Sequence, residues 1–182
     1  MEEMNHIKYD IDEQNQYSRR NILRFHKVPV PPGTHHTINT DNIVLDLVNN
    51  KMNLTPPLTL DEIDRSHTMG PVDQGTVQTI CKFTTWNTKF RVISQKKNLA
   101  KHKTSQFRVF ITEDLTKPKK EIIYHLNNAR LNKKIFSFWT VDGKIFYKER
   151  ESDLKVHVKD LEKINYLVPD PIKKMVQNPW KA

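Results

Sequence analysis

The stretch EQNQYSRRNILRFHKVP, residues 13–29, decides how the rest of the chain is interpreted, because two arginines come directly before a strand-like run. Successive side chains of a strand point to opposite faces of a sheet. Leu23 and Phe25 are therefore expected on one face, with Arg24 and His26 on the other. This alternation predicts a strand with an apolar buried face and a basic open face.

Apolar spacing and turn residues predict the elements that follow this strand. We expect strands at 22–28, around Ile63 and Arg65, at 77–85 and at 107–115, with helices over 37–53 and 86–103. The order strand, helix, strand, strand, helix, strand is typical of the ferredoxin-like fold that RNA-recognition motifs use. The sequence therefore predicts an α+β, ferredoxin-like (RRM-like) domain over 19–115, with a four-stranded antiparallel sheet and two helices.

Within these elements, Thr40 or Asp41 is expected to cap the first helix. The second helix is basic and amphipathic, and Phe90, Ile93 and Leu99 are expected to face inward.

The residues before this domain form a short predicted helix over 1–18. Met4, Ile7, Ile11 and Gln14 are spaced 3-4-3, as in the a and d positions of a coiled coil. Two heptads are too few to hold together alone. The pattern is equally typical of a disordered tail and of the end of a longer coiled coil.

A small α+β C-terminal domain is predicted over 116–168, followed by a flexible tail at 169–182. Its elements are a helix over 117–134, a hairpin in FSFWTVDGKIFYKE that turns at Asp142-Gly143, a strand at 154–158 and a short helix at 160–167. Trp139 is expected in the core of this domain, because phenylalanines flank it.

The charge balance favours a polyanionic partner. The chain of 182 residues carries a formal net charge of +9, and its segment from Lys82 to Lys134 holds fourteen Lys and Arg against three acids. Cys81 is the one cysteine, which excludes an internal disulfide and a cysteine-based zinc site. No phosphate-cradling glycine motif, secretory signal or membrane-length apolar run occurs, so we expect an intracellular protein without a membrane partner, cofactor or metal.

Basic side chains near the predicted sheet, together with one aromatic residue, are the candidates for contact with nucleic acid. A basic platform with few aromatic rings can hold a single strand with little sequence selectivity. The candidates are Arg19, Arg20, Arg24, His26, Arg65, Lys82, Lys89, Lys96, Lys97, Arg108, Phe110, Lys117, Lys119, Lys120, Arg130, Lys133 and Lys134.

Four segments in this order and spacing, QYSRRN, DEIDRSH..G, FITEDLT and FSFWTVDGKIFYK, resemble the first open-reading-frame protein of metazoan LINE-type retrotransposons. The resemblance runs from about Glu13 to Val168. The last 60 residues are also similar to the C-terminal domain of the baculovirus few-polyhedra (FP) protein.

The resemblance implies a coiled coil that trimerises, an RRM-like domain, and a small domain that closes over RNA in a basic cleft between the two domains. It implies a protein that binds single-stranded RNA and DNA, packages its transcript in a cytoplasmic or nuclear ribonucleoprotein and acts as a nucleic-acid chaperone. Arg19 and Arg20 match the family's basic linker, and Arg24, Arg65 and Lys82 match basic positions on its first three strands. Phe110 stands where mammalian relatives carry an arginine.

Two other classes of function stay open. A metal-dependent nuclease would use Asp61, Glu62 and Asp64 with His67, or Glu113 with Asp114, but no nucleophile–base pair stands out. His35 and His36 lack neighbouring ligands, and a solvated loop is expected there. A structural or assembly protein similar to the FP protein would instead present the basic face to acidic partners.

Overall fold

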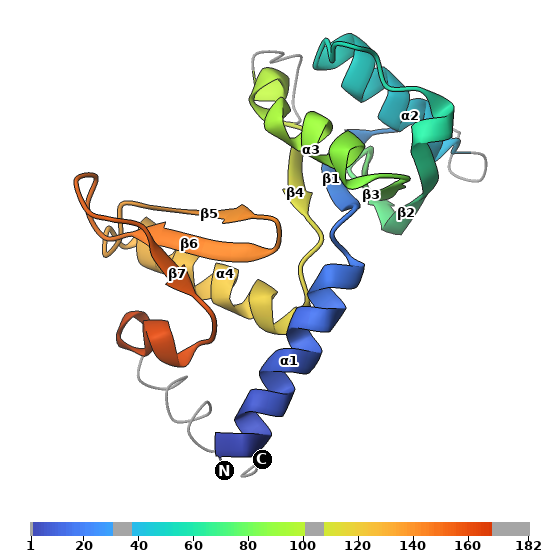
Figure 1. The fold of residues 1–182 in the computed structure, drawn as a ribbon. Helices are drawn as coiled ribbons and strands as arrows, with labels where there is room; N and C mark the ends of the chain where they lie inside the picture. Colours follow the sequence, from blue (N-terminus) through green and yellow to red (C-terminus); the bar gives the residue numbers. More distant parts are fainter. Residues whose placement is uncertain (1, 31–37, 101–107, 169–182) are drawn as a thin grey trace. The chain divides into compact units, whose positions relative to one another are not determined.

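The structure, a computed structural model, describes residues 2–30, 38–100 and 108–168 (Figure 1). The chain divides into two compact units, each of mixed α+β composition. The first unit runs from Ser18 to Asp114. The second unit comprises the chain up to Tyr17 together with the segment from Leu115 onwards. The predicted tail over 169–182 lies outside the described residues.

The Ser18–Asp114 unit contains a four-stranded antiparallel sheet, which confirms that expectation from the sequence. Its strands are β1 (Ile22–Pro29), β2 (Ile63–Asp73), β3 (Thr76–Phe83) and β4 (Phe110–Glu113). They are hydrogen-bonded in the order β2-β3-β1-β4, so the two central strands are β3 and β1.

The register of β1 follows the predicted alternation up to Phe25 and then shifts. Leu23 and Phe25 are fully buried, whereas Arg24 and His26 lie on the opposite face. Between Phe25 and Val28 the pairing with β3 is irregular, and Lys27 has a φ of +54°. This bulge inserts one extra residue, which returns Val28 to the buried face and explains the imperfect alternation of the sequence.

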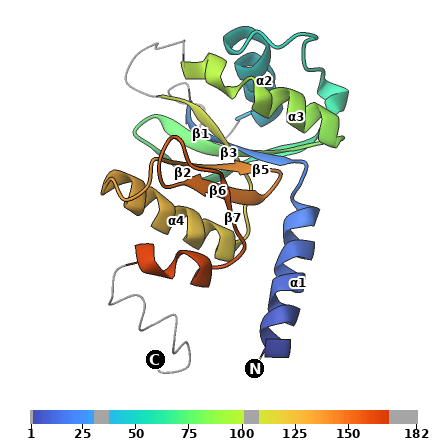
Figure 2. The same cartoon turned by 60° about the vertical axis from the view of Figure 1, so that its left-hand side comes forward.

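Helices cover one face of this sheet (Figures 1 and 2). They are α2 (Thr40–Asp46), which continues into the π-helical segment η1 (Leu47–Lys51), and α3 (Trp86–Ser94), followed by the 3-10 segment η3 (Lys96–Ala100). Val44, Val48 and Val92 are fully buried against Leu23 and Phe25 in one apolar cluster. The other face of the sheet is called the open face below.

Two details of the predicted helices are wrong. The N-cap of α2 is Asn39, whose Oδ1 accepts a hydrogen bond from the backbone of Asn42, rather than Thr40 or Asp41. Phe90 points outward and is 51% exposed. The neighbouring residue Lys89 points inward instead, and its Nζ lies 2.6 Å from Glu113 in a buried ion pair.

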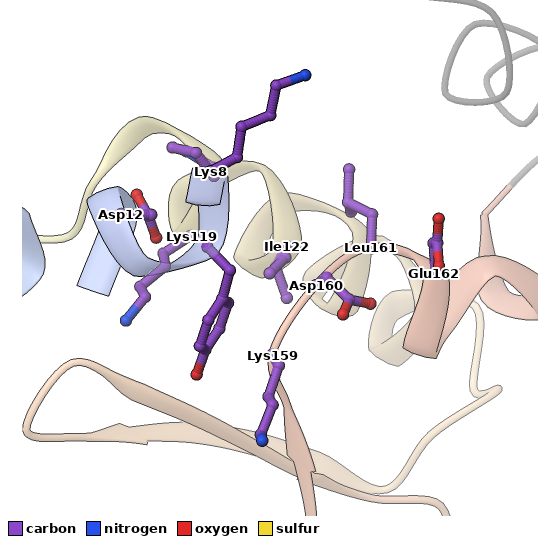
Figure 3. A pocket seen from close by; sticks show the side chains of 10 residues that line it. Lys8, Asp12, Lys119, Ile122, Lys159, Asp160, Leu161 and Glu162 are labelled. Carbon is purple, nitrogen blue, oxygen red and sulfur yellow. The ribbon is translucent and has the colours of Figure 1, made fainter. Parts of the chain in front are cut away.

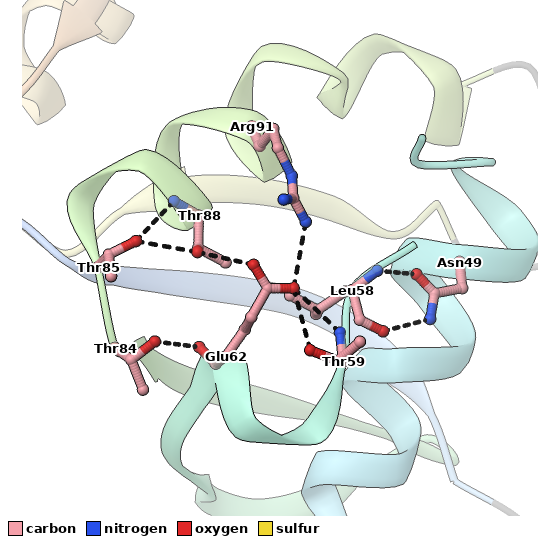
Figure 4. A network of polar contacts seen from close by, with 8 residues as sticks. All are labelled: Asn49, Leu58, Thr59, Glu62, Thr84, Thr85, Thr88 and Arg91. Carbon is pink, nitrogen blue, oxygen red and sulfur yellow. Dashed lines mark hydrogen bonds and ion pairs between the residues drawn. The ribbon is translucent and has the colours of Figure 1, made fainter. Parts of the chain in front are cut away.

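A polar network joins the turn before β2 to α3 (Figure 4). The carboxylate of Glu62 accepts hydrogen bonds from the backbone N–H of Thr59, from Thr88 Oγ1 at 3.0 Å and from Arg91 at 3.2 Å. Thr85 caps α3 by accepting from the backbone of Thr88. The network occupies Glu62, which the nuclease hypothesis would have used as a metal ligand.

The second unit is built on α4 (Lys117–Leu131) and a three-stranded sheet of β5 (Ser137–Val141), β6 (Lys144–Lys148) and β7 (Val156–Val158), ordered β5-β6-β7. A 3-10 segment, η4 (Glu162–Leu167), ends it. Asp142 and Gly143 have φ values of +54° and +75°, so the predicted hairpin turn is confirmed. Its core includes Ile122, Leu126, Ile145, Tyr147 and Ile164.

Helix α1 (Glu2–Ser18) belongs to this unit and is fixed to it by its last turns. Gln16 is buried, and its Oε1 accepts a hydrogen bond from the backbone of Thr116 at 3.0 Å. Ile7 and Ile11, at two of the predicted heptad positions, are about half exposed.

The prediction that Trp139 lies in the core is wrong. Trp139 is half-buried and does not belong to the apolar cluster of this unit. It pairs with Phe146 across the hairpin, whereas the buried residues of β6 are Ile145 and Tyr147. Because the residues of a strand alternate between faces, Trp139 and Phe146 point away from α4.

Candidate nucleic-acid interface

The open face of the four-stranded sheet brings together most of the basic side chains predicted on the strands. Arg24, in β1, lies opposite Ile80 in β3, and His67, in β2, lies on the other side of Ile80. By the same registers the outward residues are Ile22, Arg24 and His26 of β1, Arg65, His67 and Met69 of β2, Gln78, Ile80 and Lys82 of β3, and Phe110 and Thr112 of β4.

A hollow of about 330 Å³ lies at one end of this face. Three predicted cations, Arg19, Arg65 and Lys82, line it together with His67 and Asp114. Its remaining lining residues are Ser18, Ile22 and Ile80. The combination of two isoleucines and several cations suits a ligand with an apolar ring and an anionic group.

Asp114 organises the arginines beside this hollow. Its Oδ2 lies 2.6 Å from Arg19, and its Oδ1 lies 2.5 Å from Nε of Arg24. The carboxylate is 1% exposed and the Arg24 side chain 13% exposed, whereas the Arg19 side chain is 40% exposed. Arg24 thus lies on the predicted face, but Asp114 holds its guanidinium there and leaves the side chain largely buried.

A chain of hydrogen bonds continues from Arg24 across the sheet. Arg24 donates to Oε1 of Gln78 at 3.3 Å, and Nε2 of Gln78 donates to Nδ1 of His26 at 2.8 Å. The proton of His26 is therefore on Nε2, which donates to Oγ1 of Thr112 at 2.8 Å. Burial, with a smaller contribution from Arg24, lowers the pKa of His26 to about 4, so this ring is neutral at physiological pH.

Phe110 completes the open face with an aromatic surface. Its ring stacks on that of His26, with centroids 4.3 Å apart and planes 2° apart. Phe110 is 43% exposed. The structure thus shows that Phe110 is accessible, and the neutral His26 supports it from one side.

Arg65 and Lys82 are the accessible cations of the second and third strands. Arg65 is exposed, and it is paired in register with Lys82 after an irregularity at Asp64. Lys82 forms an ion pair with Asp64 at 2.7 Å, with both side chains about two-fifths exposed. Such an exposed pair is weak and leaves Lys82 able to exchange its partner for a phosphate.

Other predicted residues lie away from the open face. Lys89 and Lys119 are corrections: both are buried, Lys89 against Glu113, and Lys119 against Glu13 at 2.7 Å and the carbonyl of Gly143 at 3.0 Å. Lys96 and Lys97 are exposed on η3, on the helix-covered side. Of the rest, Arg20 is half-buried just before β1 and Arg108 is exposed before β4, whereas the exposed Lys117, Lys120, Arg130, Lys133 and Lys134 belong to the second unit.

Asp114 and Thr112 are residues of the candidate interface that the list of sequence candidates lacks, and they contact Arg24 and His26. Both follow Phe110 at even spacing, which places them on the same face of a strand. That parity places Asp114 on the same side of its segment as Phe110, but it does not show that this segment lies beside Arg24 of β1. The earlier interpretation of Asp114 as a metal ligand beside Glu113 fails, because adjacent residues of a strand face opposite ways.

The part of the chain that the structure describes contains no group of three or more His, Cys, Asp or Glu side chains able to hold a metal ion. His35 and His36 lie outside the described residues. Cys81 is buried among apolar neighbours, and burial raises the pKa of its thiol to about 12.

A larger hollow, of about 610 Å³, lies within the second unit (Figure 3). Lysines line it together with acids, and Lys119 is already paired with Glu13. Its lining residues are Lys8, Tyr9, Asp12, Pro118, Lys119, Ile122, Lys159, Asp160, Leu161 and Glu162. This mixed charge gives no preference for an anionic ligand, so the open face is the stronger candidate.

Comparison with protein-family models and with curated proteins finds no match to this chain. Among the described residues, no helix has the length and apolar character needed to cross a membrane.

Proposed function

We propose that this protein binds single-stranded nucleic acid through the open face of the Ser18–Asp114 sheet. The observation that carries the proposal is the position of Arg19, Arg65 and Lys82 around one hollow, on the same face as the exposed ring of Phe110. Cations bind the phosphate backbone, and an aromatic ring stacks on bases of any identity. The expected binding is salt-dependent and weakly selective for sequence.

Each open-face residue then has a distinct role. Arg65 and Lys82 contact phosphates. Arg19 contacts phosphate with the exposed part of its side chain, while Asp114 holds its guanidinium in place. Phe110 stacks on a base, and His26 supports its ring from behind. Arg24 is a positioning residue, since its guanidinium links Asp114 to Gln78.

We further propose that this unit is a ferredoxin-like, RRM-like domain. The strand order β2-β3-β1-β4, with helices between the first and second and between the third and fourth strands, supports this assignment. In such domains the two central strands present the nucleic-acid surface, and here those strands are β3 and β1. The resemblance to LINE-type first open-reading-frame proteins implies the same activity and a role in packaging or chaperoning RNA.

The test is a salt titration of binding to fluorescently labelled single-stranded RNA and DNA. For about five phosphate contacts, log K should fall against log salt concentration with a slope near −3.5. The variant Arg65→Ser/Lys82→Ser should reduce the steepness of this slope by about 1.4, at ~0.7 for each contact. The matched control is Lys96→Ser/Lys97→Ser, which removes two exposed cations from the helix-covered side and should leave the slope unchanged.

Equal effects of the two double variants would show that binding follows net charge alone and would contradict the proposal. Heparin and polyglutamate serve as polyanions without bases. If polyglutamate competes as well as RNA does, the basic face binds acidic proteins, and the protein is an assembly factor rather than a nucleic-acid-binding one.

A further inference from the structure

The outer face of the β5-β6-β7 sheet carries a row of aromatic rings that the open-face site does not use. Trp139, Phe146 and His157 lie side by side on the three strands. The centroids of Trp139 and Phe146 are 6.1 Å apart with planes 21° apart, and those of Phe146 and His157 are 5.1 Å apart with planes 31° apart. We call this row the aromatic ladder.

The apolar core of the unit does not explain the ladder. Helix α4 and the segment η4 pack against the opposite face, where Ile145, Tyr147 and Val158 are buried (Figure 1). None of the three ladder rings belongs to that cluster, and all three are half-buried. Large rings on the far side of a sheet from its core are typical of a binding surface.

Lysines surround the ladder. Nζ of Lys155 lies 5.0 Å from the centroid of Phe146, and exposed Lys144 precedes Phe146 on the same face. By strand parity the outward residues of the three strands are Ser137, Trp139, Val141, Lys144, Phe146, Lys148 and His157, and Lys155 lies beside Phe146 just before β7. These positions hold three lysines and no acid, so the charge of this face is complementary to a polyanion.

The third ring of the ladder is uncharged at neutral pH. Burial and the nearby Lys144, Lys159 and Lys119 lower the pKa of His157, and Glu13 opposes them. A neutral imidazole presents a flat surface to a base in the same way as the other two rings.

We propose that the aromatic ladder is a second site for single-stranded nucleic acid, in which unpaired bases stack on Trp139 and Phe146 while Lys144 and Lys155 contact the adjoining phosphates. Stacking platforms edged by cations bind single strands with little dependence on sequence. This site would act on the same class of ligand as the open face, but it uses other residues and stands independently of that proposal. Two such surfaces on one chain would raise the affinity for longer strands through effective concentration.

Fluorescence of Trp139 tests the proposal in the full chain. The sequence has three tryptophans, so Trp86→Phe/Trp180→Phe leaves Trp139 as the reporter. The open face is neutralised in the same protein by Arg65→Ser/Lys82→Ser, and a short oligo(dT) is added. We expect the emission of Trp139 to be quenched on binding, because a stacked base quenches indole fluorescence.

Variants then connect quenching with affinity. In the same background, Phe146→Ala should weaken oligo(dT) binding by about 5- to 100-fold, as expected for the loss of one stacked base, whereas Phe146→Tyr should retain it. Tyr124→Ala is the control, since Tyr124 is an exposed ring on α4 of the same unit, and it should leave affinity unchanged. Urea unfolding of each variant shows that it is folded.

Binding of oligo(dT) without a change in Trp139 emission would overturn the proposal, as would equal effects of Phe146→Ala and Tyr124→Ala. Quenching by polyglutamate equal to that by oligo(dT) would assign the ladder to an acidic protein and would also overturn it. If the wild-type chain binds no oligonucleotide, both sites are excluded. If the ladder variants weaken binding while the Arg65 and Lys82 substitutions have no effect, the open-face proposal fails and the ladder stands.

Discussion

Arg24 and Asp114, ninety residues apart in the sequence, form an ion pair in which Nε of the guanidinium lies 2.5 Å from Oδ1 of the carboxylate. The pair joins the strand that opens the first unit to the residue that closes it. Arg19 binds the other oxygen, so one buried carboxylate holds two guanidinium groups. The pair thus stabilises the sheet and also limits how much positive charge the open face presents.

Replacing Asp114 should separate these two effects. Asp114→Asn removes the charge between two arginines, of which Arg24 is largely buried, and should lower the free energy of unfolding by about 3–5 kcal/mol. Among molecules that stay folded, the affinity for single-stranded RNA should rise, and the salt slope should steepen by about 0.7 for each phosphate gained. Urea unfolding and fluorescence anisotropy measure the two quantities.

Glu113 provides the control for this experiment, because it is the neighbouring buried carboxylate and points to the helix-covered side, where it pairs with Lys89. Glu113→Gln should also destabilise the protein but leave the salt slope unchanged. If Asp114→Asn lowers the RNA affinity by more than its smaller fraction of folded protein explains, the open-face assignment is contradicted.

The sequence predicted the sheet better than the partners of its side chains. Alternation in β1 placed Leu23 and Phe25 in the core, because burial of one face imposes a period of two. The ion pair of Arg24 with Asp114 could not be derived, since it depends on a contact between distant strands. Without knowledge of that partner, the sequence does not distinguish the largely buried Arg24 from an exposed arginine.

The errors at Phe90 and Trp139 share one physical cause. In both places an aromatic residue was assigned to the interior on hydrophobicity alone. Lys89 takes the inward position of α3 because Glu113 neutralises it, and this leaves Phe90 outside. At the hairpin, the pairing of Trp139 with Phe146 places both rings opposite to buried Ile145, a parity that the two-residue turn already implied.

Phe110 and Phe90 allow stacking to be distinguished from general hydrophobicity. Phe110→Ala should weaken binding of single-stranded RNA by about 1–3 kcal/mol, because a stacking surface is lost. Its unfolding free energy should fall by only about 1 kcal/mol or less, since the ring is half exposed. Phe90→Ala, with a similarly exposed ring on the helix-covered side, should change affinity little, as measured by anisotropy. Equal losses of affinity in the two variants would remove Phe110 from the site.

His26 should make stability depend on pH below neutrality. Its pKa is lowered from 6.5 to about 4 by burial and by Arg24, so the unfolded state binds a proton between these values when the folded state does not. The contribution of His26 is therefore complete above pH 6.5 and is lost as the pH falls toward 4, with a slope of up to about 1.4 kcal/mol per pH unit.

Urea unfolding at pH 7 and pH 5 measures this dependence. His26→Gln, which keeps hydrogen-bonding groups but does not titrate, should show a smaller loss of stability between the two pH values than the wild type. An equal loss in both proteins would mean that other groups carry the pH dependence and that His26 titrates normally.

The contact between Gln16 and Gly143 should determine how firmly α1 is fixed to the second unit. Gly143 has a φ of +75°, and a Cβ built there would lie 2.6 Å from Cγ of Gln16. Gly143→Ala should therefore destabilise the protein in two ways: by about 1–2 kcal/mol for an alanine in the left-handed conformation, and further by the clash with a buried side chain. Gln16→Ala removes the clashing atoms but leaves the backbone N–H of Thr116 without its acceptor, which should lower the free energy of unfolding by about 1–3 kcal/mol.

A double-mutant cycle measured by urea unfolding separates these effects. We expect the double variant to be more stable than the sum of the two single losses predicts, because Gln16→Ala removes the side chain with which the new Cβ at position 143 would clash. Strict additivity would show that Gln16 and Gly143 are not in contact, and that α1 is held by other residues.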